Sequence, residues 1–374
     1  MNLKRRRDMR LIKKIKWAQI MAIIMVCVGV VIAVNHNDQF YSEPIMQITV
    51  VKNLSGTKVT DEFQNQDYEH QQKISGVITN GRHVGEHLTI GNEYSDSGAM
   101  DQKLHKGQKV FLTIHDHKKL QATVKDVKRD TPIAFLITLA VCLLFVFLKW
   151  QGITVISSII INTILFITAI QLNGHVRGAN VILIFSILAM IFCTLTLILV
   201  VGWNQRMWVS LAAVVGATVV TIILLMAVFG ITHERGVYYE SMQYVTQLPR
   251  PLFVAEVLIG VLGAVMDESV DIVAALATLK NEQPTLSKRQ IFNSGRQIGR
   301  SIMGPLINVL FFVFMAETLP MTLIYLRNGN SWSYSFSMNM SLGMLSSLVS
   351  AIGIVLTVIF ASFLSSLWLK AGGR

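Results

Sequence analysis

Residues 179–201 read ANVILIFSILAMIFCTLTLILVV, a run of 23 positions without a charged side chain. An α-helix rises about 1.5 Å per residue, so about 20 apolar residues cover the roughly 30 Å hydrocarbon core of a bilayer. A run this long and this apolar is typical of a transmembrane helix. The stretch therefore predicts an integral membrane protein.

Other apolar runs of similar length lie on both sides of this one. Hydrophobic residues make up 52% and charged residues 15% of the 374-residue chain, whereas globular domains average about 25% charged residues. We therefore predict an all-α integral membrane bundle of about eight transmembrane helices. The remaining runs are Trp17–Val34, Ile133–Leu148, Ile153–Leu172, Val209–Ile231, Leu252–Leu279, Ile302–Leu326 and Leu342–Leu364.

The net charge is +11, and the basic residues are distributed along the chain as the predicted topology would require. With the N-terminus in the cytoplasm and eight spans alternating, 17 Lys and Arg residues fall inside and four in the short outer loops. This asymmetry is what the positive-inside rule expects. Basic residues near the inner surface also attract anionic lipid, so the lipid bilayer is the expected partner and nucleic acid is not.

The same topology divides the chain into five regions. Residues 1–16 form a basic cytoplasmic N-terminus and 17–34 a signal-anchor helix, uncleaved because Ala33-Val34-Asn35 is a poor cleavage site. Residues 35–131 form an extracytoplasmic domain between the first and second helices. Residues 132–366 form a seven-helix transmembrane domain, and 367–374 a cytoplasmic C-terminal tail.

The extracytoplasmic domain reads as all-β. Turn residues such as Asn80-Gly81 separate short runs rich in β-branched residues. These runs predict a small barrel or sandwich, with an OB-like fold as one option. Six histidines leave two interpretations open, a metal site or scattered residues on solvated strands: His70, His83, His87, His105, His115 and His117. The predicted strands are Met46–Val51, Lys73–Thr79, His87–Ile90, Lys109–His115 and Leu120–Val127.

Four carboxylates interrupt the sixth apolar run. At about 100° per residue, Glu256, Asp267 and Asp271 share one helix face, with Gly260 and Gly263 between them. Glu268 and Ser269 point elsewhere. Lipid cannot solvate such a face, since a carboxylate at bilayer depth costs about 2.5 kcal/mol or more. The face must therefore meet another helix or an aqueous cavity, and its two glycines would permit close approach.

Two interpretations of these acids stay open. Asp267 and Asp271 are one helical turn apart and cannot both ionise cheaply in a low dielectric, so they would share a proton or a cation. Glu256 and Glu268 complete this candidate ion or proton site. Alternatively, the aspartates form a fixed structural network with nearby arginines.

The following segment supplies those arginines. Arg296 and Arg300 are four residues apart on a predicted amphipathic helix that begins at Ser287 and leads into the seventh run. They are candidates for counter-charges, for phosphate-headgroup ligands, or for simple anchors at the inner interface. Asn308 is a candidate polar partner for the acidic face. Five glycines are candidates for close helix packing: Gly260, Gly263, Gly295, Gly299 and Gly304.

The chain contains no His-Glu-x-x-His, Gly-x-Ser-x-Gly or Walker motif. An intramembrane aspartyl enzyme would need aspartates on two facing helices, whereas these share one helix. We therefore expect no enzyme and predict no cofactor, and leave the metal question open. A metal-dependent enzyme acting on lipid headgroups is the third and least favoured function.

Two sequence blocks resemble the YibE/F-like family of bacterial membrane proteins. One is Gly260-x-x-Gly263-Ala264-Val265-Met266-Asp267, and the other runs from Ser294-Gly295-Arg296 through Gly299-Arg300 and Gly304 to Asn308. The layout of basic N-terminus, one span, β-rich domain and helical bundle is also similar. Glu268, Asp271 and Val309 depart from the family pattern. The resemblance implies a multi-pass protein of the bacterial cytoplasmic membrane, acting with a paralogous partner or as a homo-oligomer.

Two functions follow as hypotheses. The first is an ion- or proton-coupled transporter or permease whose site is the acidic face of the sixth helix. The alternative is a non-catalytic membrane scaffold or envelope-homeostasis factor whose outer β-domain binds a partner.

Overall fold

The computed structural model describes residues 17–54, 56–62, 64–98, 101–116, 120–175, 180–242 and 248–369. Three stretches named in the sequence predictions lie outside these ranges: the basic N-terminus (residues 1–16), residues 370–374 of the C-terminal tail, and His117. The chain divides after Gly152 into two compact units.

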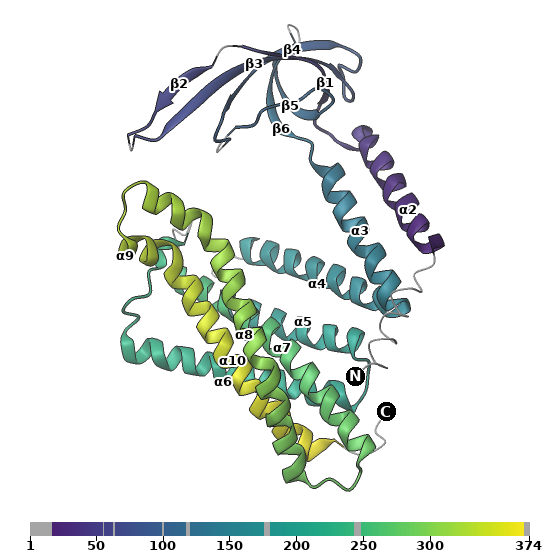
Figure 1. Ribbon diagram of the computed structural model, residues 1–374, viewed down its shortest axis with the longest axis vertical. Coiled ribbons are helices and arrows are strands. Elements are labelled where there is room, and N and C mark those ends of the chain that lie inside the picture. Colours follow the sequence, from purple (N-terminus) through teal and green to yellow (C-terminus); the bar gives the residue numbers. More distant parts are fainter. Residues whose placement is uncertain are drawn as a thin grey trace, which may run out of the picture. The chain divides into compact units, whose positions relative to one another are not determined.

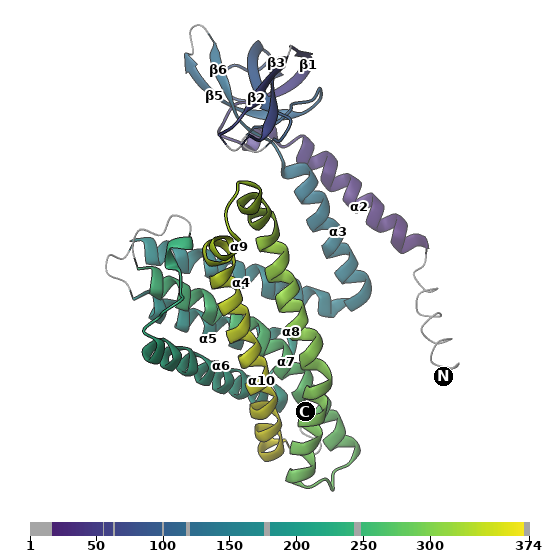
Figure 2. The same cartoon turned by 60° about the vertical axis from the view of Figure 1, so that its left-hand side comes forward.

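The first unit contains a β-domain built on a single antiparallel sheet. Its strand order is β2-β3-β1-β5-β6, and β4 pairs with β3 as a branch from this order. The sheet curls into a half-barrel, so of the predicted forms the sandwich is excluded (Figures 1 and 2). All five predicted strands are present, and β2 was not predicted. The strands are β1 (Ile45–Asn53), β2 (Thr57–Thr60), β3 (Gln66–Ile78), β4 (His87–Ser95), β5 (Lys109–Asp116) and β6 (Gln121–Val127).

Alternating apolar residues from these strands form the β-domain core, which includes Ile48, Ile74 and Val110. The buried Asn80, in the turn that follows β3, fixes the entry of the chain into this core. Its side chain accepts from the N–H of Ile45 (2.6 Å) and donates to the carbonyls of Asp38, Tyr41 and Glu43, each at 2.9 Å. One asparagine thus replaces the backbone partners that this irregular segment lacks.

Two helices of the first unit, α2 (Trp17–Asn35) and α3 (Asp130–Leu148), pack side by side (Figures 1 and 2). Where they meet the β-domain, Asp38, Lys109, Lys128 and Asp130 form what we call the junction network. Lys109 pairs with Asp38 at 2.6 Å, and Lys128 pairs with Asp130 at 2.9 Å. Both lysines also donate to carbonyls in the last turn of α2, Lys128 to Val34 at 3.0 Å. Cations at a helix C-terminus and an acid at a helix N-terminus are both favourable for the helix dipole.

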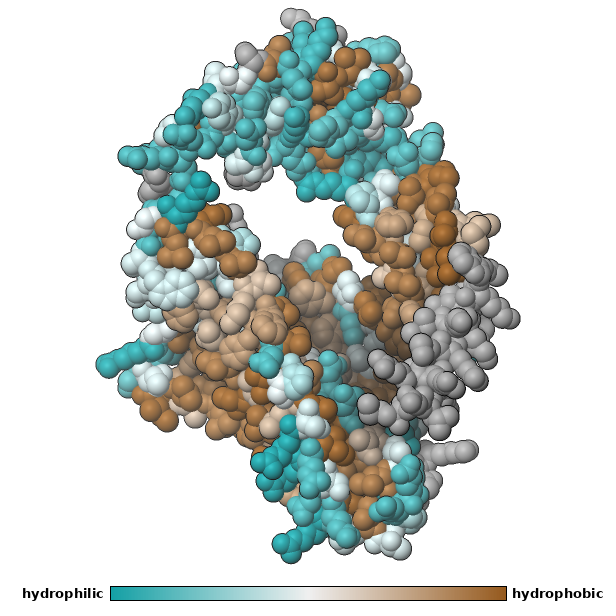
Figure 3. Space-filling view, in the orientation of Figure 1, coloured by the Kyte–Doolittle hydropathy of each residue, from teal (hydrophilic) through white to brown (hydrophobic). Residues whose placement is uncertain are grey.

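The second unit is a helical bundle, and α4 begins at the end of the first unit. Hydrophobic residues cover most of the bundle face in Figure 3, and hydrophilic ones most of the β-domain face. Six described segments are long and apolar enough to cross a membrane: α3, α4, α5, α6, α8 and the stretch containing α9 and α10. The bundle helices are α4 (Trp150–His175), α5 (Val181–Val200), α6 (Gln205–Thr232), α7 (Pro249–Glu282), α8 (Lys288–Arg327), α9 (Trp332–Ser335) and α10 (Ser341–Trp368).

One boundary differs from the sequence prediction. The amphipathic segment after Ser287 and the seventh apolar run are a single 40-residue helix, α8, with Pro305 and Pro320 inside it. Proline removes one backbone donor, and a helix in lipid tolerates this where neighbouring groups compensate. Ser287 caps the start of α8 with a capping box to Gln290.

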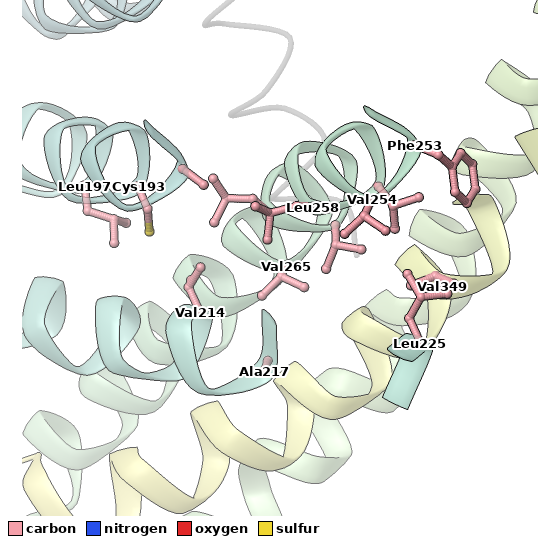
Figure 4. Packing of buried hydrophobic residues seen from close by; sticks show 14 of the residues in the cluster. Cys193, Leu197, Val214, Ala217, Leu225, Phe253, Val254, Leu258, Val265 and Val349 are labelled. Carbon is pink, nitrogen blue, oxygen red and sulfur yellow. The ribbon is translucent and has the colours of Figure 1, made fainter. Parts of the chain in front are cut away.

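Helix α10 packs against α6, α7 and α8 and so forms the centre of the bundle. Apolar side chains gather there in two groups. The first core cluster joins α5, α6 and α7 and includes Val265 and, from α10, Val349 (Figure 4). The second core cluster joins α6, α7, α8 and α10 and includes Ile272 and Val358. Between the two clusters, α7 and α10 carry polar residues.

Candidate functional site

The acidic helix of the sequence analysis is α7. It begins with Pro249 and Pro251 in its first turn, where a missing N–H costs nothing, and it continues for 34 residues. Every position of the predicted acidic stripe is exposed on the bundle surface. The positions one residue away are mostly buried. The stripe consists of Glu256, Gly260, Gly263, Asp267, Asp271, Ala274 and Thr278.

Glu268 points the other way, into the bundle. Its relative exposure is 0%, and neither carboxyl oxygen has a hydrogen-bond partner among the described residues. Its neighbour Ser269 is also fully buried and donates to the carbonyl of Ser210 on α6 at 3.3 Å. Helical spacing predicted that Glu268 lies off the stripe, but it did not predict that the side chain is wholly enclosed.

Glu268 lies between the two core clusters. On α7 it falls between Val265 of the first cluster and Ile272 of the second. Opposite, Gly353 of α10 is close enough to Val265 that an added Cβ would lie 3.0 Å from Cγ2 of that valine. One turn further on, α10 carries the fully buried Thr357. The acid therefore occupies a polar layer in an otherwise apolar core.

Hydroxyl side chains extend this layer along α10 and α6. We call these residues the hydroxyl seam. They were missed from the sequence, although Ser346, Ser350, Gly353 and Thr357 recur every three to four residues and so define one face of a helix. Those with buried side chains are Ser210, Thr218, Thr221, Ser350, Thr357, Ser362, Ser365 and Ser366.

The exposed acids form two groups. Asp267 and Asp271 lie one turn apart, and Glu256 lies in the other half of the helix. Neither group has an ion-pair partner within 4 Å among the described residues.

Arg296 and Arg300 are exposed on α8. The guanidinium of Arg296 lies 6.0 Å from the ring centroid of Phe292. In the portion of the chain that the structure describes, no ion pair joins either arginine to Asp267 or Asp271, so the alternative of a fixed internal network has no contact to support it. Asn308 is exposed as well, and among the described residues no hydrogen bond joins its side chain to α7.

The five glycines separate into two kinds. A Cβ at Gly295 would lie 2.3 Å from Oγ of Ser362, and one at Gly299 would lie 2.4 Å from Cγ1 of Val358, so both allow α8 to approach α10. A Cβ at Gly260 would lie 3.9 Å from Oγ of Ser346 and of Ser350, which is an ordinary van der Waals distance. An added Cβ at Gly263 or Gly304 would have no neighbour within 4 Å among the described residues, so their expected role in helix packing stays a prediction.

Histidines of the β-domain form local pairs. His70 lies 3.0 Å from Asp96, His83 lies 3.0 Å from Glu86, and His115 lies 2.9 Å from the hydroxyl of Thr123. Among the described residues no three metal-ligating side chains converge, so nothing there assembles a metal centre.

An apolar helical bundle with charged residues along α7, joined to a β half-barrel, defines a multi-pass α-helical membrane protein. Residues 136–371 match the family model of the YibE/F-like protein, and residues 39–127 match that of the YibE/F family N-terminal domain. The chain belongs to the YibE/F-like family. Neither the search of curated proteins nor that of solved structures found a match.

Proposed function

We propose that this protein is a proton- or cation-coupled membrane transporter whose ion site is Glu268 on α7. The observation that carries the proposal is the carboxyl of Glu268, wholly buried and without a hydrogen-bond partner in the described bundle. An ionisable residue inside a membrane bundle is costly and therefore points to an ion or proton path.

The surroundings of Glu268 decide what it can bind. An ionised carboxylate without a counter-charge in a low-dielectric core is among the most unfavourable arrangements in a protein. The carboxyl must therefore carry a proton or hold a cation. The hydroxyl seam places buried oxygen atoms on α6 and α10, and oxygens of this kind can accept from a protonated carboxyl or ligate a hard cation.

Asp267 gives the same helix an acid on its outer face. Adjacent helical residues point about 100° apart, so α7 places one carboxyl in the bundle interior and the next on its surface. A proton that crosses the bundle needs acceptors in both environments. Asp267 would receive the ion, and Glu268 would hold it away from water.

We also propose the topology of this transporter. Helices α2 and α7 cross the membrane together with the six segments that meet the length and apolarity criteria. Both termini then lie in the cytoplasm of a bacterium and the β-domain lies outside the cytoplasmic membrane. The distribution of Lys and Arg supports this orientation.

Infrared difference spectroscopy on the protein in lipid bilayers tests the site. We expect a protonated-carboxyl band at neutral pH, or a carboxylate band that shifts with one cation, and its loss in Glu268→Gln. Glu282→Gln, at the exposed end of α7, is the matched control and keeps the band. In proteoliposomes, proton or cation uptake driven by a membrane potential should fall at least tenfold in Glu268→Gln and not in Glu282→Gln.

Two results would contradict the proposal. One is a spectrum with neither band in the wild-type protein. The other is unchanged ion uptake in a Glu268→Gln protein that melts within a few degrees of wild type. The scaffold function, in which the β-domain binds a partner, would then be the better account.

A further inference from the structure

Two neighbouring helices of the bundle each present charges that the bundle leaves uncovered. On α7 these are Asp267 and Asp271, and on α8 they are Arg296 and Arg300, all four exposed and none paired with another of the four. The charges on α7 are negative and those on α8 are positive. The α7 of one copy is therefore complementary in charge to the α8 of another.

The acidic and basic residues also lie at similar distances from the α7–α8 connection, measured along each helix. Asp271 lies 12 residues before Gln283 and Arg300 lies 13 residues after Ser287, the two ends of the α7–α8 connection. At 1.5 Å per residue, these positions are about 18 Å and about 20 Å from that connection. An α7 from one bundle and an α8 from another can therefore meet with these two charges at one level.

Small residues follow the same register. When Asp271 stands opposite Arg300 on an antiparallel helix, Asp267 stands opposite Gly304, and Gly263 stands opposite Asn308. Gly263 and Gly304 are the two glycines on these helices with no neighbour within 4 Å. A larger side chain then faces a glycine at each step, which allows close approach of two helices.

Apolar helices of the chain itself do not fit this surface. Neither α2 nor α3 contains a lysine or arginine within its bounds. They would cover the acids on α7 without neutralising them, and such burial is unfavourable. A second copy of the bundle brings the missing counter-charges.

We propose that the α7–α8 face is the interface of a homodimer. Its two-fold axis runs along the membrane normal, so that Asp271 of each protomer pairs with Arg300 of its partner. A two-fold interface is isologous, and each pair is therefore made twice. This inference concerns assembly only, and it stands whether or not Glu268 carries an ion.

Charge exchange between two differently tagged copies tests it. Asp271→Arg alone gives two Arg–Arg contacts in a homodimer, and Arg300→Asp alone gives two Asp–Asp contacts. Mixed, the two variants form a heterodimer with both opposite-charge pairs restored. By single-molecule photobleaching in lipid bilayers, we expect wild type to be dimeric, each variant alone to lose at least nine-tenths of its dimers, and the co-expressed pair to recover them as mixed dimers.

Glu282→Arg and Arg289→Asp are the matched controls, since both residues are exposed beside the α7–α8 connection and outside the face. They should leave the dimer intact. Thermal melting shows that the variants are folded. A monomeric wild type, or single variants that still dimerise, would overturn the proposal. So would co-expressed single variants that show no preference for mixed dimers, because the two charges would then not pair between copies.

Discussion

Glu268 and Asp267 are adjacent acids in opposite environments. Glu268 has no exposed surface, whereas Asp267 lies on the outer stripe of the same helix. The stripe follows from helical spacing alone, and its positions were predicted correctly as one face. The enclosure of Glu268 depends on packing between helices, such as that of α10, which meets α7 at Gly353. No periodicity within α7 carries that information.

Asp67 on β3 gives a pH-dependent property outside the membrane segments. It accepts from the hydroxyl of Ser97 at 2.6 Å and from the N–H groups of Tyr68 and Ser97. The Ser97 hydroxyl is the main cause that holds the pKa of Asp67 below its ordinary value. Because the folded pKa is depressed, the carboxylate stabilises this turn fully at neutral pH and loses that effect as the pH falls through the folded pKa.

Ser97→Ala should therefore raise the pKa of Asp67 toward its ordinary value. Carbon-13 NMR of aspartate-labelled protein measures it directly. Ser75→Ala serves as control, since the Ser75 hydroxyl bonds Thr89 and no carboxylate. A titration of Asp67 that is the same in wild type and Ser97→Ala would contradict the assignment.

At the scale of elements, α8 shows where sequence reasoning reached its limit. The sequence predicted an amphipathic helix that leads into a span, and it offered the glycines as sites of close helix packing without naming the helix that they contact. In the structure, Gly295 and Gly299 provide the contact surface for α10, and the helix continues through both prolines. Near Pro320, Asn339 from a π-helical turn donates to the carbonyl of Thr318 at 2.9 Å and to the hydroxyl of Thr322 at 2.7 Å. These contacts support the interrupted stretch from outside, and no local pattern predicts them.

Glycine substitutions on α8 should separate packing from helix propensity. Gly299→Leu would overfill the contact with Val358, and overpacking costs about 1–3 kcal/mol. Gly304→Ala meets no neighbour within the chain and should stabilise the monomeric bundle by up to about 1 kcal/mol. Thermal melting of the detergent-solubilised monomer measures both. Equal effects of the two substitutions would show that α8 does not use Gly299 to approach α10.

The β-domain was predicted more completely than the site. Its five predicted strands have alternating or β-branched residues, and turn signals separate them. The missed strand, β2, has four exposed residues at the edge of the sheet and therefore no burial pattern. Edge strands of this kind form because a partner strand is present, here β3.

For the whole molecule, the proposed topology is the property to test first. The test uses a chain without its three native cysteines and with one new cysteine, either at Lys103 in the β-domain or at Gln283 in the α7–α8 connection. Each new cysteine reports on which side of the membrane its segment lies. In intact cells, a membrane-impermeant maleimide should label position 103 and leave position 283 unlabelled until the membrane is opened. Labelling in the reverse order would mean an inverted topology.

The junction network has a mechanical consequence for the first unit. Lys109 and Lys128 donate hydrogen bonds to carbonyls in the last turn of α2, and Asp130 at the start of α3 forms an ion pair with Lys128. A simple chain linker would bend under load, but α2 cannot turn about its own axis without breaking these hydrogen bonds, nor α3 without separating the Lys128–Asp130 ion pair. Force on the half-barrel, such as a bound partner pulling on it, would therefore arrive at α2 and α3 as torque and move the two helices together.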